Sequence, residues 1–303
     1  MSAAGKTAAA WWQLLRAGNV WTAVSNILAG FLLVRGQWQP VGPLLALIAA
    51  SVLLYEAGMV LNDVFDAARD ALERPERPIP SGRIARGVAL RLGLGLLATG
   101  WFFAWLASLL SGQATPWLIG LLLVVAIVGY DAGLKATWSG PIAMGLCRSL
   151  NVLLGASVAP HLIAQPAVGV VAVGVGIYTC GLTWFARREA QTSGRRDLLL
   201  GGLLLGGGLA VVAWLPALRA ILPSLAVWIG VWLLLLATVG GLIFRAISRP
   251  TPKTVQRAIK TFILLFIVVD AVVCWAVAGW VPGLVVLSLL VPTLLIARRT
   301  PMT

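Results

Sequence analysis

The sequence predicts an all-α protein, a polytopic bundle of nine transmembrane helices with a short tenth helix. Hydrophobic residues make up 60% of the 303-residue chain and charged residues 11%, with a mean hydropathy of +0.95. Charged residues fill about a quarter of a typical soluble domain, so this composition excludes that class. The apolar runs lack the alternation of a membrane β-barrel, and within lipid only helices then satisfy the backbone polar groups.

Nine apolar runs define the expected helices in chain order, and most have the roughly 20 residues that cross a bilayer. They cover residues 17–34, 43–62, 89–110, 116–131, 141–164, 167–187, 198–218, 224–244 and 261–280. A tenth run, 283–297, is interrupted by Pro292 and is expected to pack on the ninth as a short or half-crossing helix. We expect one membrane domain over residues 1–303.

Two groups of glycines indicate close contacts between helices, because small residues let helix backbones approach each other in membranes. One group comprises Gly169, Gly174 and Gly176, and the other runs from Gly201 to Gly208.

Basic side chains gather in alternate loops, which orients the bundle by the positive-inside rule. The rich loops follow runs two, six and eight, whereas Arg35 and Arg219 stand nearly alone in the others. The rich loops and the N-terminus are therefore predicted to be cytoplasmic, in what we expect to be a bacterial inner membrane. Arg298 and Arg299 predict a cytoplasmic C-terminus. Nucleic acid is not an expected partner, because the basic residues lie in short loops between helices.

The segment Asn62–Asp70 carries three carboxylates at the cytoplasmic end of the second run. Asp63, Asp66 and Asp70 are spaced i, i+3, i+7 and share one face of a helix. Three like charges so close repel each other unless a cation lies between them. Carboxylate oxygens are natural ligands of Mg²⁺, which also bridges to substrate phosphates.

Arginines beside these acids supply planar forks that bind phosphate oxygens, namely Arg69, Arg74 and Arg77. Together the two sets predict a diphosphate held through Mg²⁺ at the membrane surface. The alternative is a solvated loop of mixed charge, which the helical spacing of the acids disfavours.

These residues resemble a known motif. Asn62 to Asp70, with Arg74-Pro75-Glu76-Arg77-Pro78 and Ser81-Gly82, is similar to the first aspartate motif of the UbiA superfamily of intramembrane prenyltransferases. Tyr130 with Lys135 resembles the Tyr…Lys element at the end of the family's fourth helix. The resemblance implies a helical bundle with a lateral opening to lipid, Mg²⁺-assisted loss of diphosphate from a polyprenyl diphosphate donor, and prenyl transfer to an acceptor.

The resemblance also implies roles for single residues. Mg²⁺ is expected on Asn62, Asp63, Asp66 and Asp70. The diphosphate is expected on Asn62, Arg69, Arg74, Arg77, Tyr130, Lys135 and Arg188. Asp63, Asp66, Lys135 and Arg148 are the expected catalytic residues.

The second aspartate motif of the family departs from its usual pattern here. Over residues 184–197, four arginines surround only two carboxylates, Glu189 and Asp197. These two would carry a second metal in whole or in part, with Glu189 the more important, or the arginines would neutralise part of the diphosphate. This pattern resembles that of the EboC-type UbiA-like proteins.

Several ionisable residues lie deeper in the runs. Arg148 lies within run five, where a charge is a functional hypothesis by default; it would contact the diphosphate or the acceptor, or else snorkel or pair with Asp131. Asp131 and Lys135 form an i, i+4 pair. Asp270 lies near mid-membrane and needs only a partner such as a neighbouring hydroxyl.

The acceptor is left open among an aromatic ring, another nucleophile, and the prenyl chain itself in a cyclisation. A transporter or scaffold for a lipid or metabolite is the other class, favoured by the depleted second motif and by Asp270. A phosphotransferase acting on lipid head groups is disfavoured, because its expected motif of spaced aspartates is absent.

Overall fold

The computed structural model describes residues 3–16, 18–187, 189 and 192–297. Over these residues every regular element is helical and no strand occurs. The α-helices are α1 Ala3–Leu15, α2 Trp21–Arg35, α3 Val41–Glu73, α4 Arg86–Ser111, α5 Thr115–Ala132, α6 Gly140–Ala156, α7 Pro160–Ile163, α8 Pro166–Phe185, α9 Arg195–Ala213, α10 Leu225–Ser248, α11 Pro252–Ala278, α12 Trp280–Leu287 and α13 Leu290–Ala297. The predicted all-helical membrane fold is confirmed.

The predicted count of nine spans is not confirmed. Seven helices among the described residues are long and apolar enough to cross a membrane, namely α3, α4, α5, α8, α9 with the turn after it, α10 and α11. Helix α2 is apolar but has 15 residues. Helix α6 has 17 residues, because the run predicted over 141–164 is broken after Ala156 and resumes at Pro160 as the short α7.

Both ends of the chain differ from a simple row of spans. The apolar runs did not predict helix α1. Its residues Ala10 and Leu14 are buried against α3 and the segment that follows α3. The tenth run forms two short helices, α12 and α13, and α12 packs on α11 with Gly283 against Trp275. Arg298 and Arg299, on which the predicted side of the C-terminus depends, lie outside the described residues.

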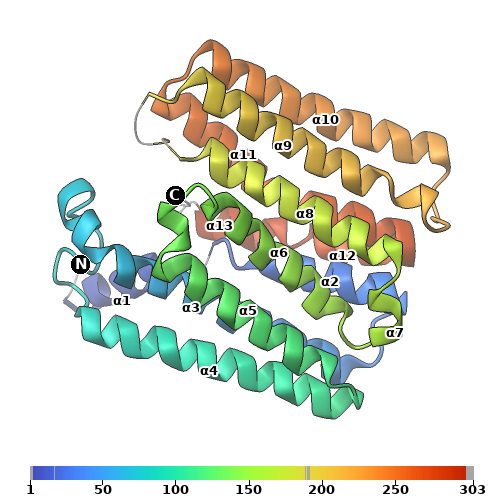
Figure 1. Ribbon diagram of the computed structural model, residues 1–303, viewed down its shortest axis with the longest axis horizontal. Helices are drawn as coiled ribbons and strands as arrows, with labels where there is room; N and C mark the ends of the chain where they lie inside the picture. Colours follow the sequence, from blue (N-terminus) through green and yellow to red (C-terminus); the bar gives the residue numbers. More distant parts are fainter. Residues whose placement is uncertain (1–2, 17, 188, 190–191, 298–303) are drawn as a thin grey trace.

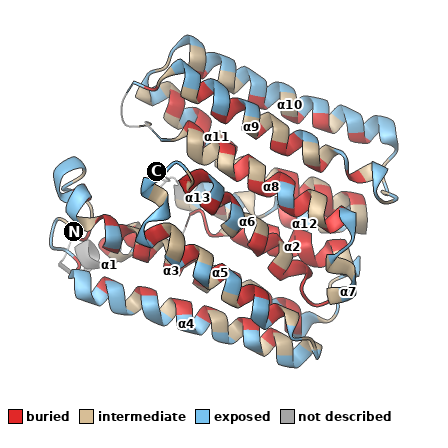
Figure 2. Cartoon of the chain, viewed as in Figure 1, coloured by how far each residue is buried: buried red, intermediate tan, exposed pale blue. Residues whose placement is uncertain are grey.

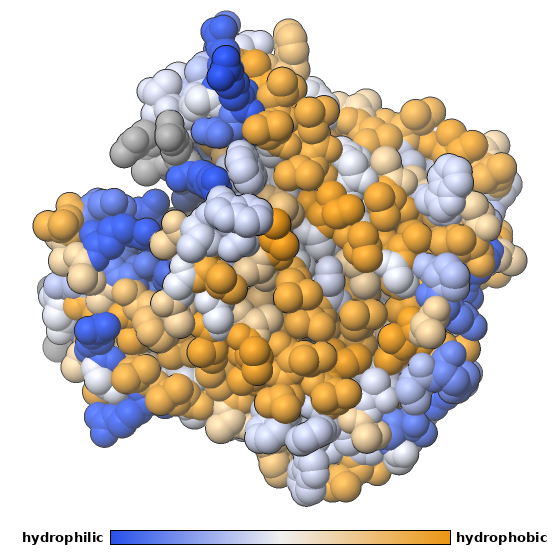
Figure 3. Space-filling model, viewed as in Figure 1, coloured by the Kyte–Doolittle hydropathy of each residue, from blue (hydrophilic) through white to orange (hydrophobic). Residues whose placement is uncertain are grey.

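The helices lie side by side (Figure 1), with α3, α4 and α5 on one side and α8, α9 and α10 on the other. Helix α6 joins the two sides, because it contacts α2, α5 and α8. Buried residues face the interior, whereas α4, α9 and α10 have exposed outer faces (Figure 2). On the face shown in Figure 3, hydrophobic side chains cover the middle and hydrophilic ones gather towards the two ends, as a protein embedded in a bilayer requires. The protein is an integral membrane protein.

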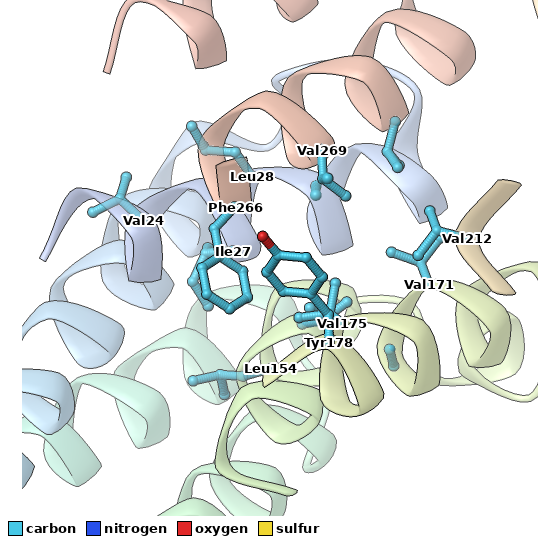
Figure 4. Close-up of a cluster of buried hydrophobic side chains, with 14 of the residues drawn as sticks. Val24, Ile27, Leu28, Leu154, Val171, Val175, Tyr178, Val212, Phe266 and Val269 are labelled. Carbon is cyan, nitrogen blue, oxygen red and sulfur yellow. The ribbon is translucent and has the colours of Figure 1, made fainter. Parts of the chain in front are cut away.

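The centre of the bundle is a dry cluster of aliphatic and aromatic side chains around Tyr178 of α8 (Figure 4). The Tyr178 ring meets that of Phe266 of α11 edge to face, with ring centroids 4.9 Å apart. Its hydroxyl donates a hydrogen bond of 2.9 Å to the Phe262 carbonyl oxygen, which satisfies the one polar atom of this side chain. This contact ties α8 to α11 across the core.

Glycines let three helices of this core touch through their backbones. A Cβ at Gly30 of α2 would overlap the Val152 carbonyl oxygen of α6, and one at Gly155 of α6 would overlap the Ile27 carbonyl oxygen of α2. Gly145 of α6 lies against the Gly176 carbonyl oxygen of α8 in the same way. Helix α6 is thus clamped between α2 and α8.

The predicted close contacts hold for part of each glycine group. Gly174, Gly176, Gly201, Gly202 and Gly208 pack tightly against neighbouring helices. For Gly169, Gly206 and Gly207 the prediction is wrong, because these three face open space.

We predict that Gly30→Ala destabilises the protein by about 1–3 kcal/mol, because the added methyl forces α2 and α6 apart. Thermal unfolding in detergent would measure the loss. The control is Gly95→Ala on α4, where a Cβ meets nothing within 4 Å, so that variant should match the wild type or exceed it slightly. Equal midpoints for wild type and Gly30→Ala would contradict the close contact.

Candidate active site

The length of α3 brings the acidic motif to the membrane surface. Its 33 residues measure about 50 Å, whereas the hydrocarbon core is about 30 Å thick. The turns from Asn62 onward therefore lie at the end of the bundle where the α3–α4, α8–α9 and α10–α11 connections also lie (Figure 1). The three aspartates of the motif are buried, so they face the interior of this end and not the solvent.

A cavity of about 650 Å³ opens at this end and extends into the bundle. Ionisable side chains surround its mouth, among them Asp66, Asp70, Lys135 and Glu189. Farther in, the walls are mostly apolar and aromatic, with Leu54, Met144, Ile263 and Phe266 among the lining residues. The cavity therefore joins a charged entrance to an apolar interior.

Asp66 is the carboxylate at the centre of the mouth. Its Oδ1 lies 3.0 Å from Lys135 Nζ, and its Oδ2 lies 3.2 Å from Arg69 Nη2. Because both oxygens already face cations, the negative charge of this carboxylate is compensated from two sides.

Arg77 joins the other two aspartates of the motif. Its Nη1 donates to Asp70 Oδ2 at 2.6 Å and to Asp63 Oδ1 at 3.2 Å. Arg16 Nη2, from the segment after α1, also donates to Asp63 Oδ1 at 3.2 Å. Asp63 is not among the described residues that line the cavity. It therefore binds Arg16 and Arg77 without contributing to the cavity wall.

Lys135 and its neighbours connect α5 to α3. Lys135 Nζ lies 4.0 Å from Asp131 Oδ1, the predicted i, i+4 pair, and donates to the Asn62 carbonyl oxygen at 3.4 Å. Asn62 Nδ2 donates to Asp131 Oδ1 at 3.1 Å. Tyr130 lines the cavity beside them. The first aspartate motif on α3 and the Tyr…Lys element after α5 thus lie next to each other in the structure.

The second motif is only partly brought to the cavity. Glu189 lines it, with Oε1 3.7 Å from Arg74 Nη2. Burial raises the pKa of the Glu189 carboxyl, and the nearby Arg74 opposes that shift. Asp197 lies in the first turn of α9 and is not among the described lining residues, so of the two carboxylates only Glu189 lines the cavity. Arg188 lies outside the described residues.

Arg148 points into the deeper part of the cavity from α6. It donates to Asn26 Oδ1 at 3.2 Å and to Thr22 Oγ1 at 2.9 Å, both on α2. The alternative that it pairs with Asp131 is wrong, because these two α2 side chains take its place. Asp270 has the expected hydroxyl partner, Ser25.

The donor atoms of the mouth fit Mg²⁺ in kind, since they are carboxylate and amide oxygens. Among the described residues, however, no three acidic, histidine or cysteine side chains converge closely enough to hold a metal ion. Arginine and lysine side chains occupy the carboxylate oxygens instead. Because Mg²⁺ is usually bound by one or two carboxylates together with substrate phosphates, the residues fit a metal that enters with a diphosphate.

Sequence reasoning gave too little weight to some residues of the site. Arg16, at the start of the first apolar run, is a plausible interfacial anchor from its position alone, yet it lines the cavity and binds Asp63. Arg187 also lines the cavity. Thr22 and Asn26 were not predicted at all, because neutral polar residues in an apolar run give no signal until their charged partner is known.

Comparison with known proteins agrees with this arrangement. The sequence profile of the UbiA prenyltransferase family matches residues 23–269. A digeranylgeranylglyceryl phosphate synthase of Sulfurisphaera tokodaii is 31% identical over 149 residues, which are 48% of this chain and 51% of the relative. One from Methanoregula boonei is 38% identical over 118 residues, 38% of this chain and 40% of the relative. The chain spans about half the length of the curated relatives it matches.

Solved structures share the fold. A UbiA homolog from Aeropyrum pernix has a TM-score of 0.64 at 17% identity, with 83% of this chain and 97% of that chain covered. A UbiA homolog from Archaeoglobus fulgidus, bound to DMAPP and Mg²⁺, has a TM-score of 0.59 at 15% identity, with 92% and 99% covered. The profile match extends over most of the chain and includes the mouth of the cavity; the protein belongs to the UbiA prenyltransferase family.

Proposed function

We propose that the protein transfers a polyprenyl group from a polyprenyl diphosphate to an acceptor within the membrane, with Mg²⁺ as cofactor. The observation that carries this proposal is the continuity of the cavity, whose charged mouth suits a diphosphate and whose apolar interior suits a prenyl chain. The mouth lies at the end with the basic loops, and we propose that this end faces the cytoplasm.

The side chains at the mouth would divide the work of binding the diphosphate. Asn62, Asp66 and Asp70 would hold Mg²⁺, with Glu189 available for a second ion. When bound, Mg²⁺ neutralises charge on the departing diphosphate. Lys135, Arg69, Arg74 and Arg77, which pair with carboxylates in this structure, would turn to the phosphate oxygens.

The transfer step breaks the bond between the prenyl C1 and the diphosphate oxygen, and the electron pair leaves with that oxygen. The cations at the mouth stabilise the developing charge. The aromatic ring of Tyr130, which lines the cavity beside Lys135, would face the allylic cation by cation–π contact. The acceptor forms the new bond to C1 and loses a proton.

The acceptor that the relatives suggest is a glyceryl phosphate. The name of these relatives describes a product with two geranylgeranyl chains. The last step in making such a product would add the second chain to a glyceryl phosphate that already carries one geranylgeranyl chain. An aromatic ring is the second candidate. Cyclisation of the donor, and transport of a lipid without chemistry, are the alternatives to transfer.

A transfer assay tests the proposal. Purified protein in lipid nanodiscs is supplied with labelled geranylgeranyl diphosphate, Mg²⁺ and either geranylgeranylglyceryl phosphate or 4-hydroxybenzoate. We expect a labelled product that depends on the acceptor. A cyclised hydrocarbon, or labelled donor recovered unchanged with every acceptor, would contradict transfer.

We predict that Asp66→Asn lowers turnover by at least about 100-fold, because it removes a charged ligand beside the leaving group. The matched control is Glu76→Gln, an exposed acid in the loop that follows α3, which does not line the cavity; this variant should keep wild-type turnover. Wild-type turnover by Asp66→Asn would show that the Asp66 carboxylate is not part of the proposed metal site.

We also predict that donor affinity rises with each added isoprene unit until the apolar part of the cavity is full. Burial of each CH₂ group contributes about 0.8 kcal/mol at most. Calorimetric binding of the C10, C15 and C20 diphosphates, with inorganic diphosphate as the reference, would measure the trend. Equal affinities for all four would contradict a prenyl-binding interior.

A further inference from the structure

The deep part of the cavity contains a cation that lies far from the mouth. The guanidinium of Arg148 lies over two aromatic rings, 5.2 Å from the centroid of Tyr55 and 5.1 Å from that of Phe266. All three side chains line the cavity. Aromatic rings in contact with a guanidinium stabilise its charge and leave its N–H groups available for hydrogen bonds.

This cation is separated from the diphosphate site along the axis of α3. Tyr55, which contacts Arg148, precedes Asp66, which contacts Lys135, by about three helical turns, or about 16 Å along the axis. One diphosphate group cannot bridge that distance. Arg148 therefore belongs to a second polar site in the same cavity.

Two side chains of α2 fix Arg148 in place. Its Nη2 donates to Thr22 Oγ1, while the Thr22 hydroxyl donates to the Asn19 carbonyl oxygen at 2.7 Å, so Thr22 can only accept from the arginine. Its Nη1 donates to Asn26 Oδ1. A guanidinium has five N–H donors, and these two bonds leave donors for a ligand in the cavity.

Asp270 of α11 orients the Asn26 amide. Its Oδ2 accepts from Asn26 Nδ2 at 2.7 Å and from Ser25 Oγ at 2.5 Å, and the carboxyl group is fully buried. Because the carboxylate accepts and the guanidinium donates, the Asn26 amide has one orientation that satisfies both. Asp270 thus acts on Arg148 through Asn26.

We propose that Arg148 forms a deep anion subsite that receives the anionic group of the acceptor, and that Asp270 is a positioning residue that holds it through Asn26. This inference rests on the proposed transfer reaction. A fixed cation with free donors in an apolar cavity selects a phosphate or carboxylate group over a neutral one. In this network Asp270 has a role in a transferase, so its presence near mid-membrane does not require that the protein is a transporter.

The experiment compares acceptors that differ only in charge. One pair is geranylgeranylglyceryl phosphate and geranylgeranylglycerol, and the other is 4-hydroxybenzoate and its methyl ester. For each pair we measure thermal stabilisation without donor, and the rate of prenylation with geranylgeranyl diphosphate. The wild type should prefer the charged member of at least one pair by about tenfold or more, and that pair identifies the anion as phosphate or carboxylate.

Arg148→Met should abolish the preference while the affinity for geranylgeranyl diphosphate stays within about twofold of wild type, because the mouth is untouched. Asp270→Leu should reduce the preference by raising KM for the charged acceptor, since Asn26 loses the partner that orients it. Asp270→Asn should keep the preference for the charged acceptor, because the amide carbonyl oxygen of the new side chain still accepts a hydrogen bond from Asn26. Ser157→Ala, a buried hydroxyl that bonds only within its own stretch of chain, should behave as wild type.

Two results would overturn the inference: an unchanged preference in Arg148→Met, or Asp270→Leu and Asp270→Asn behaving alike. Should Asp270→Leu not fold, Asn26→Leu tests the same link. Prenylation by the wild type without any charge preference would refute the subsite and leave the proposed function standing. Charge-selective stabilisation through Arg148 without prenylation of any acceptor would refute the function and leave the subsite standing.

Discussion

The contact between the backbones of α2 and α6 is the constraint on which the rest of the site depends. Gly30 and Gly155 let the two helices approach so closely that each would meet the other's carbonyl oxygens with a larger side chain. At this separation Thr22 and Asn26 of α2 accept hydrogen bonds from Arg148 of α6. On its other side, α6 packs against α8 through Gly145. The depth of Arg148 in the cavity is therefore set by the packing of the α6 backbone and not by a flexible side chain.

The mouth of the cavity follows a different principle, the compensation of charge. Each carboxylate of the motif on α3 faces an arginine or a lysine, and no free acidic cluster waits for a metal in the part of the chain that the structure describes. Such pairing keeps like charges apart and the bundle end folded. In the proposed reaction the same pairing would hold the cations where the diphosphate binds, because a diphosphate with Mg²⁺ would exchange one set of ion pairs for another. The ion pairs at Asp66 would then be exchangeable, whereas Arg148 is held in place by Thr22 and Asn26.

Much of this could be predicted from the sequence, because apolar runs report helices and the spacing of charged residues reports a shared face. The helical bundle follows from such patterns. The meeting of Asn62 with Lys135 agrees with the family resemblance, and the hydroxyl partner of Asp270 agrees with the expectation for a buried acid. Boundaries set by tertiary contacts did not follow: the break after Ala156, the division of the last run, and α1. Nor did the partners of Arg148, because Asn26 is a neutral residue in an apolar helix, and its role appears only once α11 places Asp270 beside it. Asp197 and Glu189 share one motif in the sequence, but among the described residues only Glu189 lines the cavity.

The central claim is that the mouth binds a prenyl diphosphate and Mg²⁺ together, and thermal unfolding of the detergent-purified protein tests it most directly. The midpoint is measured with Mg²⁺ alone, with geranylgeranyl diphosphate alone, and with both, at concentrations well above saturation. The account predicts little change with the metal alone, a small increase with the diphosphate alone, and a large increase with both, since binding to the folded state stabilises by mass action. The same increase with and without Mg²⁺, or none with both ligands present, would contradict it.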